Sequence, residues 1–269
     1  MQPALVASGL TKVIGDRTIV DDVSFELFPG EVFGFLGPNG AGKTTTIRML
    51  VGLIRPTAGS VTICGHDLRH EFEDAMRCIG CIVENPDLYR FMTGRENLEH
   101  FARMLRVPDS EIERVAALVN LSHRLEQRVG TYSLGMRQRL GIAQALLGSP
   151  RVLILDEPAN GLDPAGIREI RELLRALAAE HRMAVFISSH LLAEIELICD
   201  RVAIIHKGRI LRAGNVRELI SGQRVPESEV ERANALLRDH GIDAAIHASE
   251  RRQTLEEMFL ETTGGESVD

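Results

Sequence analysis

The segment from residue 37 to residue 44 constrains the fold of this chain more than any other part of it. It reads Gly-Pro-Asn-Gly-Ala-Gly-Lys-Thr and fits the pattern G-x-x-x-x-G-K-[ST]. The apolar run 31–36 before it predicts a buried strand, and residues 44–51 after it are typical of a helix. An accidental match is the alternative, at roughly one chance in a hundred from glycine content. The strand and helix around the pattern favour a loop that binds phosphate groups.

Each fixed position of this loop has a physical reason. Gly37, Gly40 and Gly42 permit positive φ and let backbone N–H groups approach phosphate oxygens. The helix that begins after Gly42 directs its N-terminal dipole at the same anion. Lys43 is expected to neutralise the terminal phosphates, and the Thr44 hydroxyl to bind Mg²⁺. The expected phosphate-binding residues are Gly37, Pro38, Asn39, Gly40, Ala41, Gly42, Lys43, Thr44 and Thr45.

The overall charge and hydropathy exclude several classes of function. The 269 residues carry a formal net charge of −7, whereas a broad nucleic-acid surface normally needs a basic face. No apolar run approaches the roughly 20 residues that span a bilayer, and the N-terminus lacks the pattern of a signal sequence. We therefore expect a cytoplasmic protein that acts at a membrane only through a partner.

A single C-x-x-C motif, Cys78 to Cys81, has Cys64 and two histidines shortly upstream. Such a group could be drawn as a metal site. However, residues 79–83 predict a buried strand, which would point the two thiols to opposite faces. Small core residues are the favoured interpretation.

Strand-like and helix-like segments alternate along most of the chain, which predicts an α/β core with a mostly parallel sheet. Short strands near the N-terminus predict an antiparallel β subdomain, and a helical subdomain is expected at about residues 85–150. Residues 1–222 then form one domain, and 223–269 a small appendage with a helix at 253–260. The expected strands are 5–10, 18–27, 31–36, 60–64, 79–83, 151–156, 184–187, 202–206 and 209–213, and the main helices are 97–105, 112–119, 137–147, 163–181 and 191–199.

Two acidic residues lie at the end of the predicted strand 151–156. Asp156 ends this predicted strand, where it can hold Mg²⁺ through its water shell. Glu157 is next, and it can activate a water molecule for in-line attack on a γ-phosphate. A solvated turn is the alternative, since Asp-Glu-Pro is typical turn chemistry.

Two further segments point to the same chemistry. His190 follows the predicted strand 184–187 and can reach the same phosphate if the strands are parallel neighbours. The alternative is a residue at the start of a helix, which is the more common role of a histidine in such a position. Ser133 and Gly135 open a predicted helix, where a hydroxyl and a glycine make a second anion site. Plain N-capping by Ser133 is the alternative.

With these motifs in this order, residues 4–220 resemble the ATP-binding subunit of ABC transporters, whose core is that of a P-loop NTPase. Five ordered motifs are more specific than any one of them. They are the phosphate loop 37–44, Tyr132-Ser-Leu-Gly-Met136, Asp156-Glu157, Asn160-Gly-Leu-Asp163-Pro and Ser189-His190.

The resemblance implies a head-to-tail dimer that encloses two ATP molecules. Ser133 and Gly135 of one copy would contact the γ-phosphate held by the phosphate loop of the other. Asp163 would lie across the same interface, His190 would position the γ-phosphate, and Glu157 would be the base. The chain carries one such unit, so we expect it to pair with itself.

Three positions depart from the family pattern. Glu84 stands where a glutamine usually contacts Mg²⁺. In the segment from Tyr132 to Met136, which is the signature of the family, Leu134 and Met136 replace the commonest residues. Ile14 replaces the aromatic residue that stacks on adenine. Losing the ring contact forfeits on the order of 1 kcal/mol and relaxes base selectivity. The first two departures, with the segment 93–98, resemble exporters of bacitracin, lantibiotics and related peptides.

The leading hypothesis is an Mg²⁺-dependent ATPase that powers a separately encoded permease, with export of a peptide antibiotic, a drug or a similar compound. Residues 84–98 would pass the movement to the permease. The first alternative is a non-transport member of the superfamily that acts on nucleic acid or ribosomes. The second is a regulator that binds ATP without hydrolysing it, against which the intact Glu157 and His190 argue.

Overall fold

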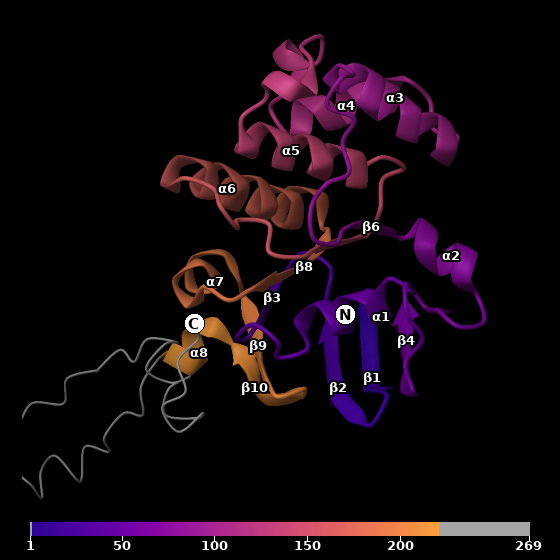
Figure 1. Cartoon of the computed structure of the whole chain (residues 1–269), viewed down its shortest axis with the longest axis vertical. Helices are drawn as coiled ribbons and strands as arrows, with labels where there is room; N and C mark the ends of the chain where they lie inside the picture. The colour runs from indigo at the N-terminus through magenta and orange to yellow at the C-terminus, as the bar shows by residue number, and fades with distance from the viewer. Residues whose placement is uncertain (1, 221–269) are drawn as a thin grey trace, which may run out of the picture.

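A computed structural model describes residues 2–220, so the predicted appendage and its helix at 253–260 lie outside the described residues. Two β-sheets and a set of helices make up this part of the chain (Figure 1). The strands are β1 (Leu5–Ile14), β2 (Arg17–Leu27), β3 (Val32–Leu36), β4 (Ala58–Ile63), β5 (His66–Asp67), β6 (Ile79–Ile82), β7 (Val152–Leu155), β8 (Ala184–Ser189), β9 (Arg201–His206) and β10 (Arg209–Asn215). The α-helices are α1 (Lys43–Leu50), α2 (Phe72–Arg77), α3 (Gly94–Leu105), α4 (Ser110–Leu118), α5 (Leu134–Ala145), α6 (Pro164–His181), α7 (Leu192–Ile198) and α8 (Val216–Ile220), with 3₁₀ turns at Ser122–Arg124 and Val129–Thr131.

The six-stranded sheet forms the centre of the fold, in the order β10-β9-β3-β8-β7-β6. Its strands are parallel except β10, which pairs antiparallel with β9. Both faces are buried, so alternate residues of one strand enter different cores: Phe33 and Phe35 face one core, while Val32 and Leu36 face the other. The predicted α/β core with a mostly parallel sheet is confirmed.

The N-terminal sheet is antiparallel, as predicted, with the order β2-β1-β4-β5. Aromatic packing joins it to the central sheet. The ring of Phe25 on β2 lies 5.3 Å from Phe33, 5.6 Å from Phe35 and 5.7 Å from Phe186. Helix α1 packs into the same core through Ile47 and neighbouring apolar residues.

The inserted helices α3, α4 and α5 lie between β6 and β7 in the sequence and gather at the far side of α6 from the N-terminal sheet (Figure 1). They share one apolar core with α6, α7 and the second face of the central sheet. Helix α3 begins with a capping box, in which the Thr93 hydroxyl accepts from the Glu96 N–H and the Glu96 carboxylate accepts from the Thr93 N–H.

Some local predictions were wrong. Strand β1 continues four residues past the predicted end to Ile14, because it pairs with β2 along its whole length. Helix α2 was not predicted, and Cys78 is its C-cap, so it does not continue the alternation of the strand that follows. Cys78 and Cys81 therefore do not point to opposite faces, and both pack against the same core.

Burial raises the pKa of the Cys64 thiol to about 11, with Cys78 as its neighbour. Within residues 2–220, no group of three histidine, cysteine or acidic residues is arranged to hold a metal ion. In the same part of the chain, every helix is too short or too polar to cross a membrane.

Candidate nucleotide-binding site

The phosphate loop connects β3 to α1, and two of its three glycines, Gly40 and Gly42, use the positive φ that glycine permits, whereas Gly37 does not. Gly40 and Gly42 have φ of 79° and 107°. A Cβ atom added at Gly37 would lie 2.3 Å from the Ile205 carbonyl oxygen, and one at Gly42 would lie 2.9 Å from that of Ile19. A Cβ at Gly40 would meet no atom within 4 Å. The loop is therefore tightly packed on its protein side and open at Gly40, which fits a cradle for a phosphate.

Lys43 is the first residue of α1, and its side chain is only 5% exposed. The ammonium Nζ donates to the carbonyl oxygens of Gly37, at 2.6 Å, and Pro38, at 3.3 Å. It also lies 3.3 Å from Oε1 of Glu157. The structure thus places Lys43 between the phosphate loop and the residue predicted to be the base.

Asp156 follows β7 and is almost fully buried. Its Oδ2 accepts a hydrogen bond of 3.0 Å from the Thr44 hydroxyl, and its Oδ1 accepts one of 2.5 Å from the Ser188 hydroxyl. Carboxylate and hydroxyl oxygens are ligands that suit Mg²⁺. Two of the three predicted metal ligands, Thr44 and Asp156, therefore lie side by side.

Glu157 adopts a left-handed conformation with φ of 51°, which is uncommon for a residue other than glycine. Its N–H donates to the Ser188 hydroxyl at 2.9 Å. Its Oε2 lies 2.8 Å from Nδ1 of His190, while Oε1 faces Lys43. Because β3, β8 and β7 are neighbours and parallel, the residues after their carboxyl ends meet at one edge of the sheet.

Sequence reasoning missed two residues of this site. Ser188 is fully buried and joins the Asp156 carboxylate to the Glu157 backbone. Glu194 on α7 is half-buried, and its Oε1 has no hydrogen-bond partner among the described residues. Burial raises the pKa of the Glu194 carboxyl, against the attraction of His190. The small polar residues at the end of a strand were the signal for Ser188, whereas a helix-surface glutamate gives no such signal.

Glu84, the third predicted metal ligand, follows β6, which is the neighbour of β7 in the central sheet. It has φ of 68°, and its carboxylate forms an exposed ion pair with Arg48. Arg48 follows Thr44 by four residues, so the two lie on the same face of α1. Ile14, the predicted adenine contact, is the last residue of β1 and is 56% exposed.

The signature residues belong to the helical part of the chain. Ser133 caps α5, its hydroxyl accepting from the Met136 N–H at 3.2 Å, so the predicted alternative of N-capping is observed. Asp163 caps α6, with Pro164 at the first turn, as the sequence predicted. Within residues 2–220, no hydrogen bond or ion pair joins Ser133 or Gly135 to the phosphate loop.

Comparison with known proteins agrees with this geometry. The family described as "ABC transporter" matches residues 20–160. The chain is 57% identical over 219 residues to "Uncharacterized ABC transporter ATP-binding protein YhcH" of Bacillus subtilis (strain 168), covering 81% of this chain and 72% of that protein. The chain belongs to the ATP-binding subunits of ABC transporters. As a member of this family it binds ATP, and it is an ATPase coupled to transport.

Two further comparisons define its place among ABC ATP-binding subunits. The chain is 48% identical over 212 residues to "Bacitracin transport ATP-binding protein BcrA" of Bacillus licheniformis, covering 78% of this chain and 69% of that protein. A solved "Structure of ATP binding subunit of ABC transporter" superposes with a TM-score of 0.76 at 29% identity and covers 97% of this chain and 99% of the other. The resemblance inferred from the sequence motifs is confirmed, and subunits of this kind work with membrane permeases.

Proposed function

We propose that this chain hydrolyses ATP with Glu157 as the general base and His190 and Lys43 as the groups that hold the γ-phosphate. The observation that carries the proposal is the chain of contacts from Lys43 through Glu157 to His190 at one edge of the sheet. Glu157 can accept a proton from an attacking water, and His190 fixes its orientation. The buried ammonium of Lys43 supplies charge where phosphate charge has to be neutralised.

Thr44 and Asp156 are the proposed Mg²⁺ ligands, and their hydrogen bond supports this role. The ion, when bound, would neutralise phosphate charge during hydrolysis. Glu84 is proposed as a third ligand, and for this it would have to leave Arg48. Ile14 is proposed to face adenine without ring stacking.

The active unit is proposed to be a head-to-tail homodimer. Ser133, Gly135 and Asp163 lie on the helical side, and α5 and α6 lie away from α1 across the central sheet (Figure 1). Residues of a second copy would therefore complete the site that begins at the phosphate loop. If dimer formation is prevented, the monomer should no longer hydrolyse ATP but should still bind nucleotide weakly.

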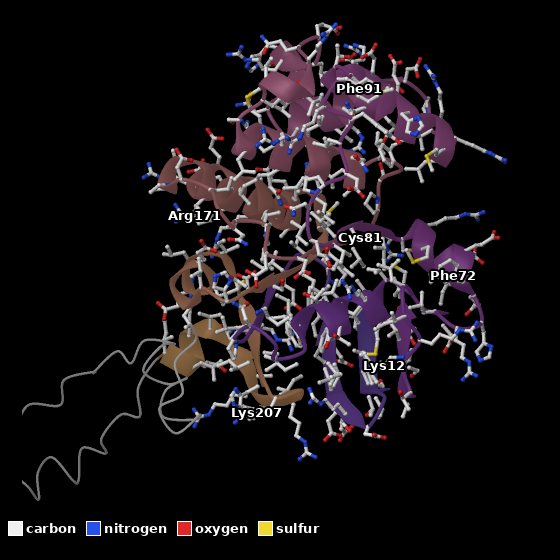
Figure 2. The ribbon with its side chains drawn as sticks, viewed as in Figure 1. Lys12, Phe72, Cys81, Phe91, Arg171 and Lys207 are labelled. Carbon is white, nitrogen blue, oxygen red and sulfur yellow. The ribbon has the colours of Figure 1, made fainter. Side chains whose placement is uncertain are left out.

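The permease is proposed to dock on an aromatic surface that includes the start of α3. Tyr89 packs edge-on against Phe91, with 5.9 Å between ring centres, and against His100 at 5.4 Å. Phe91, labelled in Figure 2, is 70% exposed, and Tyr89 is 42% exposed. Exposed apolar side chains in such a group are typical of a protein-protein contact. A cytoplasmic subunit held at the membrane through its permease would use this surface.

The transported compound is proposed to be a peptide antibiotic or a similar compound that is exported. The support is the 48% identity to a protein named for bacitracin transport. The acidic net charge of −7 supports a function without nucleic acid.

Replacement of Glu157 by Gln tests the proposal. The side chain keeps its size and loses its basicity, so ATP turnover should fall by at least about a hundredfold, the range expected for a general base. Light scattering during size exclusion should show an ATP-dependent dimer in E157Q. Glu172→Gln, an exposed change on α6, serves as the matched control and should hydrolyse ATP like the unmodified chain. Undiminished hydrolysis by E157Q would refute the assignment of the base.

A further inference from the structure

A second concave site lies at the opposite edge of the central sheet from the phosphate loop. It is a cavity of about 490 Å³, which we term the basal pocket. Its walls include Pro29, Arg151 and Met183, which precede β3, β7 and β8. Strand β8 has six residues, so the two edges are about 20 Å apart. The basal pocket is therefore separate from the ATP site although the same strands support both.

The basal pocket has an apolar floor. Leu146 and Leu177 are almost fully buried beneath it, and Met183 is nearly as buried. Leu118 on α4 contributes a partly exposed apolar wall. The volume of the basal pocket lies in the range of about 300–1,000 Å³ that is usual for sites of small organic molecules, and its lining is about equally apolar and polar.

The rim of the basal pocket is cationic. Arg114, Arg151, His181 and Arg182 line it, and no aspartate or glutamate does. Arg114 is matched by Glu111, which accepts from its guanidinium at 3.0 and 2.7 Å. Among residues 2–220, Arg151 and Arg182 have no carboxylate within ion-pair distance. Two arginines that have no carboxylate partner among residues 2–220 thus flank an apolar floor, on a chain with a net charge of −7.

The C-terminal end of α6 explains why His181 and Arg182 are basic, but it does not explain Arg151. His181 and Arg182 stand at the C-terminal end of α6, where the partial negative charge of the helix favours cations. Arg151 precedes a strand and belongs to no helix end. Its position beside an apolar floor is the feature that requires another explanation.

We propose that the basal pocket binds a small amphiphilic anion, an organic molecule with an apolar body and one carboxylate or phosphate group. The body would lie on Leu146, Leu177 and Met183, and the charged group would be bound by Arg151 and Arg182. The walls come from both α4 and α6, so the ligand would bridge the inserted helices and the core. Binding should stabilise the folded chain against heat, as for any ligand specific for the native state.

The test is calorimetric titration of the full chain, with ADP present throughout to occupy the phosphate loop. Decanoate and decyl phosphate are the probes for the two head groups, acetate lacks the apolar body, and decanol lacks the charge. We expect saturable binding of decanoate, decyl phosphate or both, and binding of acetate and decanol weaker by at least about tenfold. The head group that binds more tightly identifies the chemical source of the ligand.

Charge reversal in the double variant R151E/R182E should weaken decanoate binding by at least about tenfold. The matched control is R168E/R171E, which makes the same change of charge at two residues of α6 that do not line the basal pocket (Arg171 is labelled in Figure 2). The control should bind decanoate within about twofold of the unmodified chain. If R151E/R182E unfolds at a lower temperature than the control, R151Q and R182Q replace it, and each should weaken binding severalfold.

Three results would overturn the proposal. The first is absence of saturable binding for both charged probes, which would leave the arginines as surface and helix-end residues. The second is equal affinity for decanol and decanoate. The third is an equal loss of binding in the pocket variant and the control, which would show a general effect of charge.

Discussion

Replacement of Ser188 by Ala should affect both stability and catalysis, because this buried hydroxyl joins two parts of the site. It donates to the Asp156 carboxylate at 2.5 Å and accepts from the Glu157 N–H at 2.9 Å. Alanine fills nearly the same space and removes only the oxygen. The variant therefore leaves one carboxylate oxygen and one backbone N–H without their partner.

The expected loss of stability follows from the two groups that lose their hydrogen-bond partner. A buried polar group that loses its partner costs about 1–3 kcal/mol. Asp156 keeps the Thr44 hydroxyl, and the Glu157 side chain is 22% exposed, so water can replace part of the loss. We expect the free energy of unfolding to fall by about 2–4 kcal/mol. At about 2–4 °C per kcal/mol for a domain of this size, the melting temperature should fall by roughly 4–16 °C.

Catalysis should suffer for a separate reason. Glu157 is held at φ of 51° with its N–H on Ser188, and this conformation directs its carboxylate to His190. Without the hydrogen bond the backbone can relax to a more favourable conformation. We expect kcat to fall by about tenfold or more, as for a misplaced general base. KM should change less, because Lys43 and the phosphate loop are untouched.

Urea unfolding and steady-state phosphate release on the same preparations measure both effects. Ser189→Ala is the matched control, because its hydroxyl accepts from the Leu191 N–H at 3.0 Å and bonds to the Glu194 carboxyl on α7, and neither contact joins two strands. The control should lose about 1–2 kcal/mol, the ordinary value of two hydrogen bonds. A free energy of unfolding for S188A within about 0.5 kcal/mol of the unmodified chain would refute the reasoning.

Three further predictions rest on other contacts. Gly80→Ala should lower the free energy of unfolding by at least about 1–3 kcal/mol in urea, because the added Cβ would lie 2.0 Å from the Ala145 carbonyl oxygen; an unchanged midpoint would contradict this. The Arg114 guanidinium holds the pKa of Glu111 below its usual value. This pair therefore stabilises the fold fully above the unfolded-state pKa of about 4.3, and the stabilisation is lost as the pH falls through the lower folded-state pKa. Glu111→Gln should therefore lose less stability on acidification than the unmodified chain, and equal losses in urea titrations at several pH values would disprove the effect. Because Ile14 offers no ring, GTP should compete with ATP within roughly tenfold in nucleotide titrations, and a thousandfold preference for ATP would show that another contact selects the base.

The parallel core could be predicted because its strands are buried on both faces and read as continuous apolar runs. β7, with the sequence Val-Leu-Ile-Leu, has all four residues buried. Helix α2 escaped prediction for the opposite reason: it is six residues long and Ala75 is its only buried residue. Its apolar pattern is too weak to indicate a helix, so the expected directions of the two thiols were derived from the alternation of the strand 79–83, which Cys78 does not follow.

The candidate site was predictable to the extent that strand ends determine it. Asp156, Glu157 and His190 follow adjacent parallel strands, so topology brings them together before any side chain is placed. The ion pair of Glu84 with Arg48 depends on side-chain rotamers and on the positive φ of Glu84. Neither property is visible in the spacing of residues, so the sequence could not indicate that the Glu84 carboxylate pairs with Arg48.

The amino ends of adjacent parallel strands also lie together. If residues after adjacent parallel strands meet at one edge of the sheet, the residues before those strands must meet at the other edge. Arg151 directly precedes β7, and Arg182 and Met183 precede β8. All three line the basal pocket. Topology thus brings the two arginines together at the amino ends of neighbouring strands, as it brings the acidic residues together at the carboxyl ends.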